Sequence, residues 1–155
     1  MILLTAFKNT SSEKLLSKLK NFDNLNLEND REKSAVQLCD KLNKSSYRLI
    51  LSFGQRPLIK DKIHFESTAR DKGGSEIHTD FDIETSISVC KELGLFAKRS
   101  DNAGTSYCNN IRTHFLNTKM CFVHIPFEKN ISDFYLFTEM IKKYIVKTGE
   151  QYGQN

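Results

Sequence analysis

The stretch that decides the fold is Met120–Pro126, MCFVHIP, an apolar run interrupted by a single histidine. Short apolar runs bounded by turn signals are typical of buried strands, and Pro126 ends this one because proline has no backbone N–H. Side chains alternate along a strand, so Met120, Phe122 and His124 share one face. The imidazole of His124 is therefore expected beside apolar side chains, at the carboxyl end of a strand.

Four more segments are predicted strands, namely ILLTAF (2–7), YRLILSF (47–53), KIHFE (62–66) and LFAKR (95–99). The first two are apolar runs of the kind found in parallel strands that are buried on both faces. The third alternates, so His64 and Glu66 face away from Ile63 and Phe65. These strands supply a sheet around which the rest of the chain can pack.

Helices are predicted between the strands: after an N-cap at Ser11 or Ser12, and over 31–43, 81–94, 107–116 and 132–147. The polar stretch 67–80, which contains Gly73-Gly74, is predicted to be a loop. Because strand and helix alternate, we expect a single α/β domain over residues 1–155. Its architecture would be a three-layer α/β/α sandwich around a mostly parallel sheet.

The composition narrows the class of protein. With 155 residues, 39% hydrophobic and 27% charged, the chain is typical of one globular domain. Its formal charge of +4 comes from lysines scattered among acids, so we expect no nucleic-acid partner. No apolar run approaches the roughly 20 residues of a membrane span, and the N-terminus lacks the basic segment of a signal peptide. We therefore expect a cytoplasmic protein without a membrane partner.

Candidate functional residues lie where predicted strands end, at Phe7, Gln55, Glu66 and His124. Cys108 lies at the predicted start of a helix, where unpaired backbone N–H groups favour a thiolate and could also receive an oxyanion. A thiolate nucleophile needs a base, which His124 could be, and the base needs an orienting group, which Glu66 could be. Spacing alone does not separate this triad from a packed thiol.

Three alternatives accompany the triad. Cysteines of a cytoplasmic protein stay reduced, and Cys39, Cys90 and Cys121 lie on predicted apolar faces, so we interpret them as core thiols. A zinc site would consist of Cys108, His114, Cys121 and His124, but these intervals do not match the usual ligand pairs, and we predict no metal. His64 is a rival base, since it shares a strand face with Glu66.

The segment NAGTSYCN (102–109) resembles the Ala-Gly-Thr-x-x-Cys-Asn signature of pyroglutamyl peptidase I, the pyrrolidone carboxyl peptidases, a family of cysteine hydrolases. Other segments are similar to further motifs of this family, and they occur in the same order along the chain. They are FVHIP (122–126) to Phe-x-His-Val-Pro, IHFE with Ala69 to Ile-x-x-Glu-x-x-Ala, LSFGQ (51–55) to a Gly-Gln strand end, and 1–7 to Leu-x-Thr-Gly-Phe. The chain is identified as a short, divergent member.

The resemblance implies a hydrolase that removes N-terminal pyroglutamate from peptides and uses no cofactor. Cys108 would attack the amide carbonyl, His124 would move the proton, and Glu66 would orient His124. Phe7 would pack on the lactam ring and Gln55 would hydrogen-bond it. The expected partners are a peptide or small amide substrate and, in a homo-oligomer, a second copy of the chain.

The sequence also departs from the family pattern. Thr10 stands where the family has a second aromatic residue, and Glu76 stands where it has an arginine; no motif assigns Arg56 or Arg70 as a replacement. Two alternatives follow. The same triad could act on another small lactam or amide, or the chain could be a catalytically inactive binding module that kept the fold.

Overall fold

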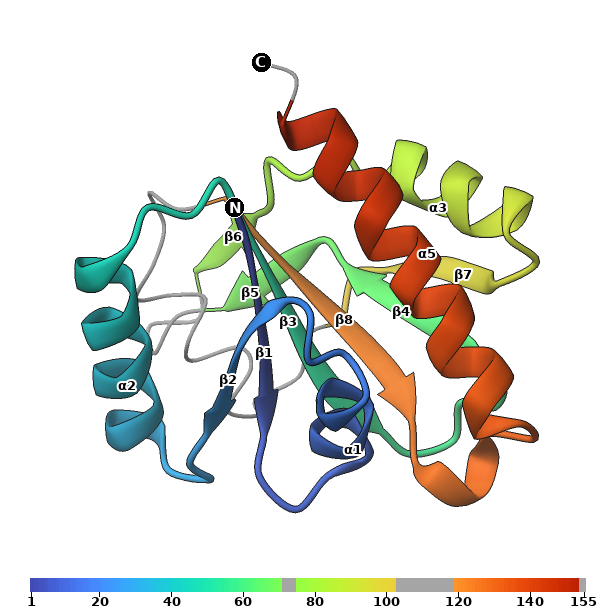
Figure 1. Cartoon of the computed structure of the whole chain (residues 1–155), viewed down its shortest axis with the longest axis horizontal. Helices are drawn as coiled ribbons and strands as arrows, with labels where there is room; N and C mark the ends of the chain where they lie inside the picture. The colour runs from blue at the N-terminus through green and yellow to red at the C-terminus, as the bar shows by residue number, and fades with distance from the viewer. Residues whose placement is uncertain (71–74, 103–118, 154–155) are drawn as a thin grey trace.

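The computed structural model describes residues 1–70, 75–102 and 119–153. Six strands form one sheet in the order β2-β1-β3-β8-β4-β7 (Figure 1). Their bounds are β1 Ile2–Phe7, β2 Asp23–Leu27, β3 Leu49–Arg56, β4 Lys62–Glu66, β7 Phe96–Ser100 and β8 Met120–Pro126. The five predicted strands are confirmed. The polar stretch 21–30, in which the alternation of Leu25 and Leu27 is consistent with a loop or a short strand, contains the edge strand β2.

The sheet is mostly parallel. Strands β2, β1, β3 and β8 run in the same direction, whereas β4 is antiparallel to β8 and β7 is parallel to β4. Figure 1 shows the reversal where the arrows of β8 and β4 point in opposite directions. This reversal determines which residues of β4 lie beside His124.

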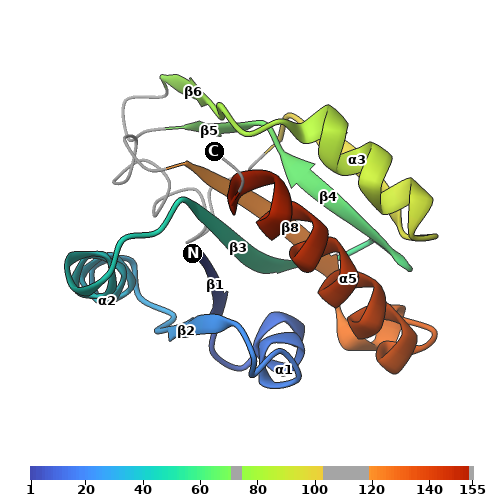
Figure 2. The ribbon, with the colours of Figure 1, turned by 45° about the horizontal axis from the view of Figure 1, so that its top comes forward.

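The helices form two layers. Their bounds are α1 Ser11–Ser17, α2 Arg31–Lys44, α3 Ile83–Glu92 and α5 Phe134–Gly153, with a short 3-10 helix η1 at Glu128–Asn130. Leu15 of α1, Cys90 of α3 and Tyr144 of α5 belong to one core, whereas Leu38 of α2 belongs to another. The predicted three-layer sandwich is thus confirmed in the part of the chain that the structure describes (Figures 1 and 2).

The two cores lie on opposite faces of the sheet because strand side chains alternate. Leu51 and Phe53 of β3 face α1, α3 and α5, and Val123 of β8 does the same. Ile50 of β3 and Phe122 of β8 face the α2 side. Glu66 and His124, by the same alternation, also belong to the α2 side.

Two expectations about local structure are wrong. Thr10, and not Ser11 or Ser12, is the N-cap of α1, because its side chain accepts a hydrogen bond from the backbone N–H of Glu13. The predicted loop 67–80 contains the strands β5 Thr68–Arg70 and β6 Glu76–His78, which pair antiparallel outside the main sheet (Figure 2). Each has three residues, too few for a hydrophobic alternation to stand out.

The remaining predicted helices agree in place with the structure but not in every boundary. The closing helix is longer at its carboxyl end than predicted, and Gly94 after α3 has a positive φ of 78°, as a helix-ending glycine does. The predicted helix 107–116 lies outside the described residues. No helix among the described ranges combines the length and hydropathy needed to span a bilayer.

Candidate active site

Glu66 and His124 form a hydrogen-bonded pair on the α2 face of the sheet. Nδ1 of His124 lies 2.8 Å from Oε1 of Glu66. Glu66 is 0% exposed and His124 is 5% exposed. The antiparallel register sets Glu66 opposite Phe122, two residues from His124, so the pair is a diagonal contact between adjacent strands. The structure therefore brings together two of the three predicted triad residues.

This contact fixes the tautomer of the imidazole. An ionised carboxylate can only accept hydrogen bonds, so Nδ1 of His124 carries the hydrogen and donates it to Glu66. Nε2 of the neutral ring is then left with its lone pair. A ring held in this way can take a proton at Nε2 while Glu66 stabilises the imidazolium that forms.

Arg56 is a third member of the cluster and was not assigned a role by the sequence. Its Nη1 donates to the same Oε1 of Glu66 at 2.9 Å and lies 3.2 Å from the hydroxyl of Ser100. The sequence alone predicts only that Gly54 and Arg56 share a face of the strand. Arg56 is two residues after Gly54, which pairs with His124, and alternation therefore places its side chain on the same face.

His64, the rival base, also lies in this cluster. It is the direct cross-strand partner of His124, and among the described residues neither of its ring nitrogens has a hydrogen-bond partner. Burial lowers the pKa of His64 below its usual 6.5, and the positive charges of Arg56 and Lys62 lower it further. His64 is therefore neutral at neutral pH, without a carboxylate to orient it as Glu66 orients His124.

Phe7 lies on the same face of the sheet as His124. It is 4% exposed and packs among Leu27 and Leu38. The paired residues of β1 and β3 end at Ala6 and Phe53, so Phe7 and Gly54 are next in line, and Gly54 pairs with His124. Because glycine has no side chain, β3 places nothing between the aromatic ring of Phe7 and the imidazole.

Gln55 points to the other face. Its Oε1 accepts hydrogen bonds from the backbone N–H of Ser11 at 3.0 Å and from the Ser11 hydroxyl at 3.3 Å. The Ser11 hydroxyl also donates to the carbonyl of Pro126 at 2.7 Å. The Gln55 side chain thus ties the start of α1 to the carboxyl ends of β3 and β8, and the structure does not bring it beside Glu66 and His124.

Cys108 and His114 lie outside the described residues. Two members of the zinc alternative are therefore not placed, and the other two point to opposite faces of the sheet, since Cys121 belongs to the core under α1, α3 and α5. Within residues 1–70, 75–102 and 119–153, no group of three or more His, Cys, Asp or Glu side chains could hold a metal ion.

The other cysteines differ from one another. Cys90 and Cys121 are buried, as predicted for core thiols. Cys39 is exposed, which corrects the expectation that it belongs to the apolar face of its helix. The face of α2 that packs on the sheet is centred on Leu38, and the neighbouring position 39 is turned about 100° away from it.

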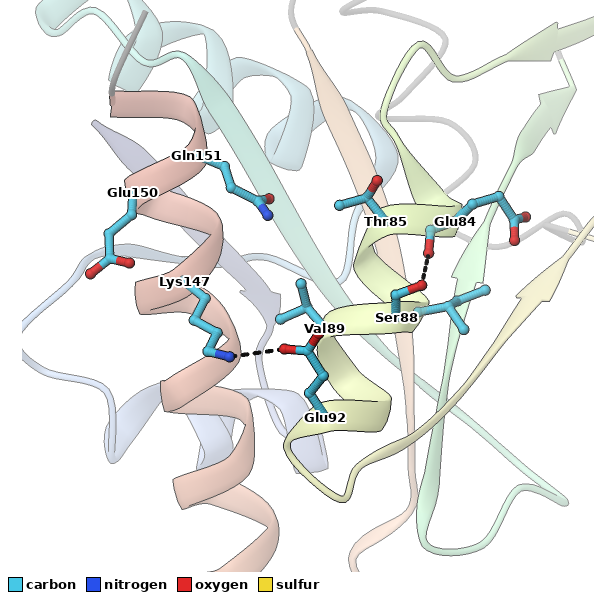
Figure 3. A pocket seen from close by; sticks show the side chains of 9 residues that line it. Glu84, Thr85, Ser88, Val89, Glu92, Lys147, Glu150 and Gln151 are labelled. Carbon is cyan, nitrogen blue, oxygen red and sulfur yellow. Dashed lines mark hydrogen bonds and ion pairs between the residues drawn. The ribbon is translucent and has the colours of Figure 1, made fainter.

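A wide groove of about 650 Å³ runs between α3 and α5 (Figure 3). Glu92 and Lys147 face each other across it with a 3.2 Å ion pair. None of the predicted site residues that the structure describes lines this groove, because α3 and α5 cover the opposite face of the sheet from Glu66 and His124. We therefore place the candidate site at the buried pair and not at the groove.

The fold and the pair together define a class: an α/β sandwich that carries a carboxylate-oriented histidine suited to general-base chemistry. No family model and no curated protein sequence matches the chain. Solved structures do match. The pyrrolidone carboxyl peptidase of Fervidobacterium islandicum AW-1 superposes with a TM-score of 0.80 at 21% identity, covering 96% of this chain and 98% of that one.

Two more structures give the same result. Pyroglutamyl peptidase I of Bacillus amyloliquefaciens has a TM-score of 0.80 at 18% identity, with 97% of each chain covered. The pyrrolidone carboxyl peptidase of Thermococcus litoralis has a TM-score of 0.77 at 14% identity, with coverage of 99% of this chain and 96% of that one. The chain thus has the α/β fold of the pyroglutamyl peptidases, and the resemblance seen in the sequence motifs is confirmed at the level of the fold.

Proposed function

We propose that the chain is a cysteine hydrolase that removes N-terminal pyroglutamate from peptides through a triad of Cys108, His124 and Glu66. The observation that carries the proposal is the 2.8 Å contact between Nδ1 of His124 and Oε1 of Glu66, buried in a fold shared with pyroglutamyl peptidases. A buried carboxylate that orients a histidine allows the imidazole to act as the base that deprotonates a nucleophile.

In the proposed reaction, Nε2 of His124 takes the proton of the Cys108 thiol, and the thiolate attacks the amide carbonyl. The C–N bond breaks as His124 returns the proton to the leaving amine. A water molecule, deprotonated by His124, then hydrolyses the thioester and regenerates the thiol. This chemistry needs a reduced cysteine and no cofactor, which fits the expected cytoplasmic location.

Phe7 and Gln55 are the proposed contacts to the lactam ring. The support for Phe7 is its place on the His124 face, with only Gly54 between them in the register. A flat five-membered ring could lie there against an aromatic side chain. For Gln55 the support is the resemblance alone, since its side-chain oxygen is already bound by Ser11.

A fluorogenic pyroglutamyl amide tests the proposal directly. We expect turnover by the wild-type protein, none by Cys108→Ser, and a kcat lower by about 10²–10⁴-fold for Glu66→Gln, which no longer stabilises the imidazolium. The matched control substrate is the same amide with an unblocked amino acid, which should not be cleaved. Wild-type turnover of the pyroglutamyl amide that does not exceed that of Cys108→Ser would overturn the proposal.

A second candidate is the same triad acting on another small lactam or amide. The observation that favours it is Thr10, which stands where the family has its second aromatic residue. Thr10 is occupied as a helix cap, since its hydroxyl donates to the carbonyl of Phe7 at 2.6 Å and accepts from the N–H of Glu13 at 3.2 Å. Cleavage of other amides in a panel, dependent on Cys108, with no cleavage of the pyroglutamyl amide would favour this candidate.

A further inference from the structure

Oε1 of Glu66 is shared by two donors that come from different strands. Nδ1 of His124 on β8 approaches it to 2.8 Å, and Nη1 of Arg56 on β3 approaches it to 2.9 Å. Nη1 of Arg56 also donates to the hydroxyl of Ser100 on β7, at 3.2 Å. One guanidinium therefore connects β3 and β7 to the carboxylate that orients the histidine.

From this geometry we propose that Arg56 is a positioning residue, which holds the Glu66 carboxylate in the orientation that receives Nδ1–H of His124. Its effect on catalysis rests on the proposed function, whereas its effect on the Glu66–His124 pair does not. Arg56 would act through Glu66 and would not touch the substrate.

The burial of Glu66 gives a physical reason for such a residue. A fully buried carboxylate is costly unless its charge is compensated and its oxygens are hydrogen-bonded. A neutral imidazole supplies a hydrogen bond but no charge, while the guanidinium of Arg56 supplies both at any physiological pH. Arg56 thus compensates Glu66 throughout a catalytic cycle in which the charge of His124 would change.

The guanidinium also suits this place because it is planar and anchored. A carboxylate held only by His124 could turn about its terminal torsion, which has a broad energy minimum. A second donor fixed to Ser100 restricts this rotation. His64 and Lys62 of β4 are further ionisable groups in this cluster, and within the described part of the chain neither is hydrogen-bonded to Oε1 of Glu66.

The test compares Arg56→Met, which removes the charge at similar length, with Arg56→Lys, which keeps it. Arg99→Met is the matched control, because Arg99 is half-exposed and pairs with Glu84 and Asp101 instead of Glu66. The first measurement is the downfield proton NMR resonance of Nδ1–H of His124, assigned by its absence in His124→Gln. We expect Arg56→Met to broaden or shift this resonance and Arg99→Met to leave it unchanged.

The second measurement is the pKa of His64 by NMR titration. Because the positive charge of Arg56 contributes to the lowered pKa of His64, this pKa should rise in Arg56→Met and stay low in Arg56→Lys.

The third measurement is the kinetics on whichever amide the wild-type protein cleaves. There kcat should fall by about 10²-fold in Arg56→Met with little change in KM, because the misplaced group is the base and not a substrate contact.

The outcomes separate this proposal from the proposed function. A wild-type protein that cleaves no amide overturns the function but leaves the NMR result to decide on Arg56. An unchanged Nδ1–H resonance and an unchanged kcat in a folded Arg56→Met overturn the positioning role. If Arg56→Met does not fold, Arg56→Lys decides, since its ammonium cannot reproduce the planar contacts to Oε1 and Ser100. A resonance and kcat identical to wild type in Arg56→Lys would then reduce Arg56 to a stabilising charge.

Discussion

At the scale of single residues, the candidate site shows how two histidines on paired positions acquire different properties. His64 and His124 are cross-strand partners, yet only His124 has a carboxylate on Nδ1. Glu66 reaches His124 because it lies two residues along β4 from His64, on the same face. Because both residues are histidines, the difference between His64 and His124 comes from the diagonal contact with Glu66.

His64 should make the folded state sensitive to acid. Its pKa in the folded protein is lowered, so the unfolded chain takes up a proton first as the pH falls through about 6.5. Protonation then favours unfolding, and stability should decrease as the pH falls from about 6.5 to the lower pKa of folded His64. In His64→Gln this part of the pH dependence should disappear, as measured by urea unfolding at pH 5 to 8.

The matched control for this experiment is His78→Gln. His78 is exposed and forms an ion pair with Glu76 at 3.4 Å. Exposed ion pairs contribute little to stability, so its replacement should leave the slope of stability against pH close to that of the wild type. Equal slopes for His64→Gln and the wild-type protein would contradict the assigned environment of His64.

At the scale of elements, the start of α1 is a joint between helix and sheet. Thr10 caps the helix, and the next residue, Ser11, holds Gln55 of β3 and the carbonyl of Pro126 at the end of β8. The carboxyl ends of two site-bearing strands are thereby connected to one short helix. The end of β1 is included as well, since the hydroxyl of Thr10 donates to the carbonyl of Phe7.

Replacing the cap tests this joint. Thr10→Ala should lower the free energy of unfolding by about 0.5–2 kcal/mol, because it leaves the N–H of Glu13 without its acceptor. Ser17→Ala, at the exposed end of the same helix, should stay within about 0.5 kcal/mol of the wild type. Urea unfolding followed by circular dichroism measures both, and equal midpoints for the two variants would show that Thr10 is not a stabilising cap.

At the scale of the whole molecule, the sheet separates two cores of different size. The core under α1, α3 and α5 holds Tyr144, whose hydroxyl bonds Ser86 at 3.1 Å and so joins α5 to α3. Among the described residues, the core on the α2 side is smaller, and the buried polar residues Glu66 and His124 lie on the same face. The candidate site, with buried Glu66 and His124, thus lies beside the apolar core on the α2 side of the sheet.

Thiol labelling reports on the integrity of this arrangement. In Cys108→Ser, iodoacetamide should modify exposed Cys39 in the native protein, and Cys90 and Cys121 only after unfolding. Burial raises the pKa of Cys90 to about 12, so its thiolate is scarce at neutral pH even where reagent reaches it. Mass spectrometry before and after denaturation gives the result. Native labelling of Cys90 as fast as that of Cys39 would mean that the larger core opens readily.

The sequence by itself determined five of the six strands of the main sheet, most of the helices and the sharing of faces. Local patterns suffice for these, because alternation in strands and the 3.6-residue period in helices are properties of neighbouring residues. It likewise singled out Glu66 and His124 at strand ends. It missed the β5–β6 pair, because strands of three residues show too little alternation. It also missed the exposure of Cys39, because the predicted apolar face of that helix included one position too many.

Only the tertiary structure decided the contacts of the site. The reversal of β4 relative to β8 sets the register that brings Oε1 of Glu66 to Nδ1 of His124, and no local pattern encodes strand direction. The same holds for Arg56, whose long side chain reaches a partner two strands away in the sheet order. These contacts depend on long-range pairing, in which residues far apart in the chain become neighbours through the sheet as a whole.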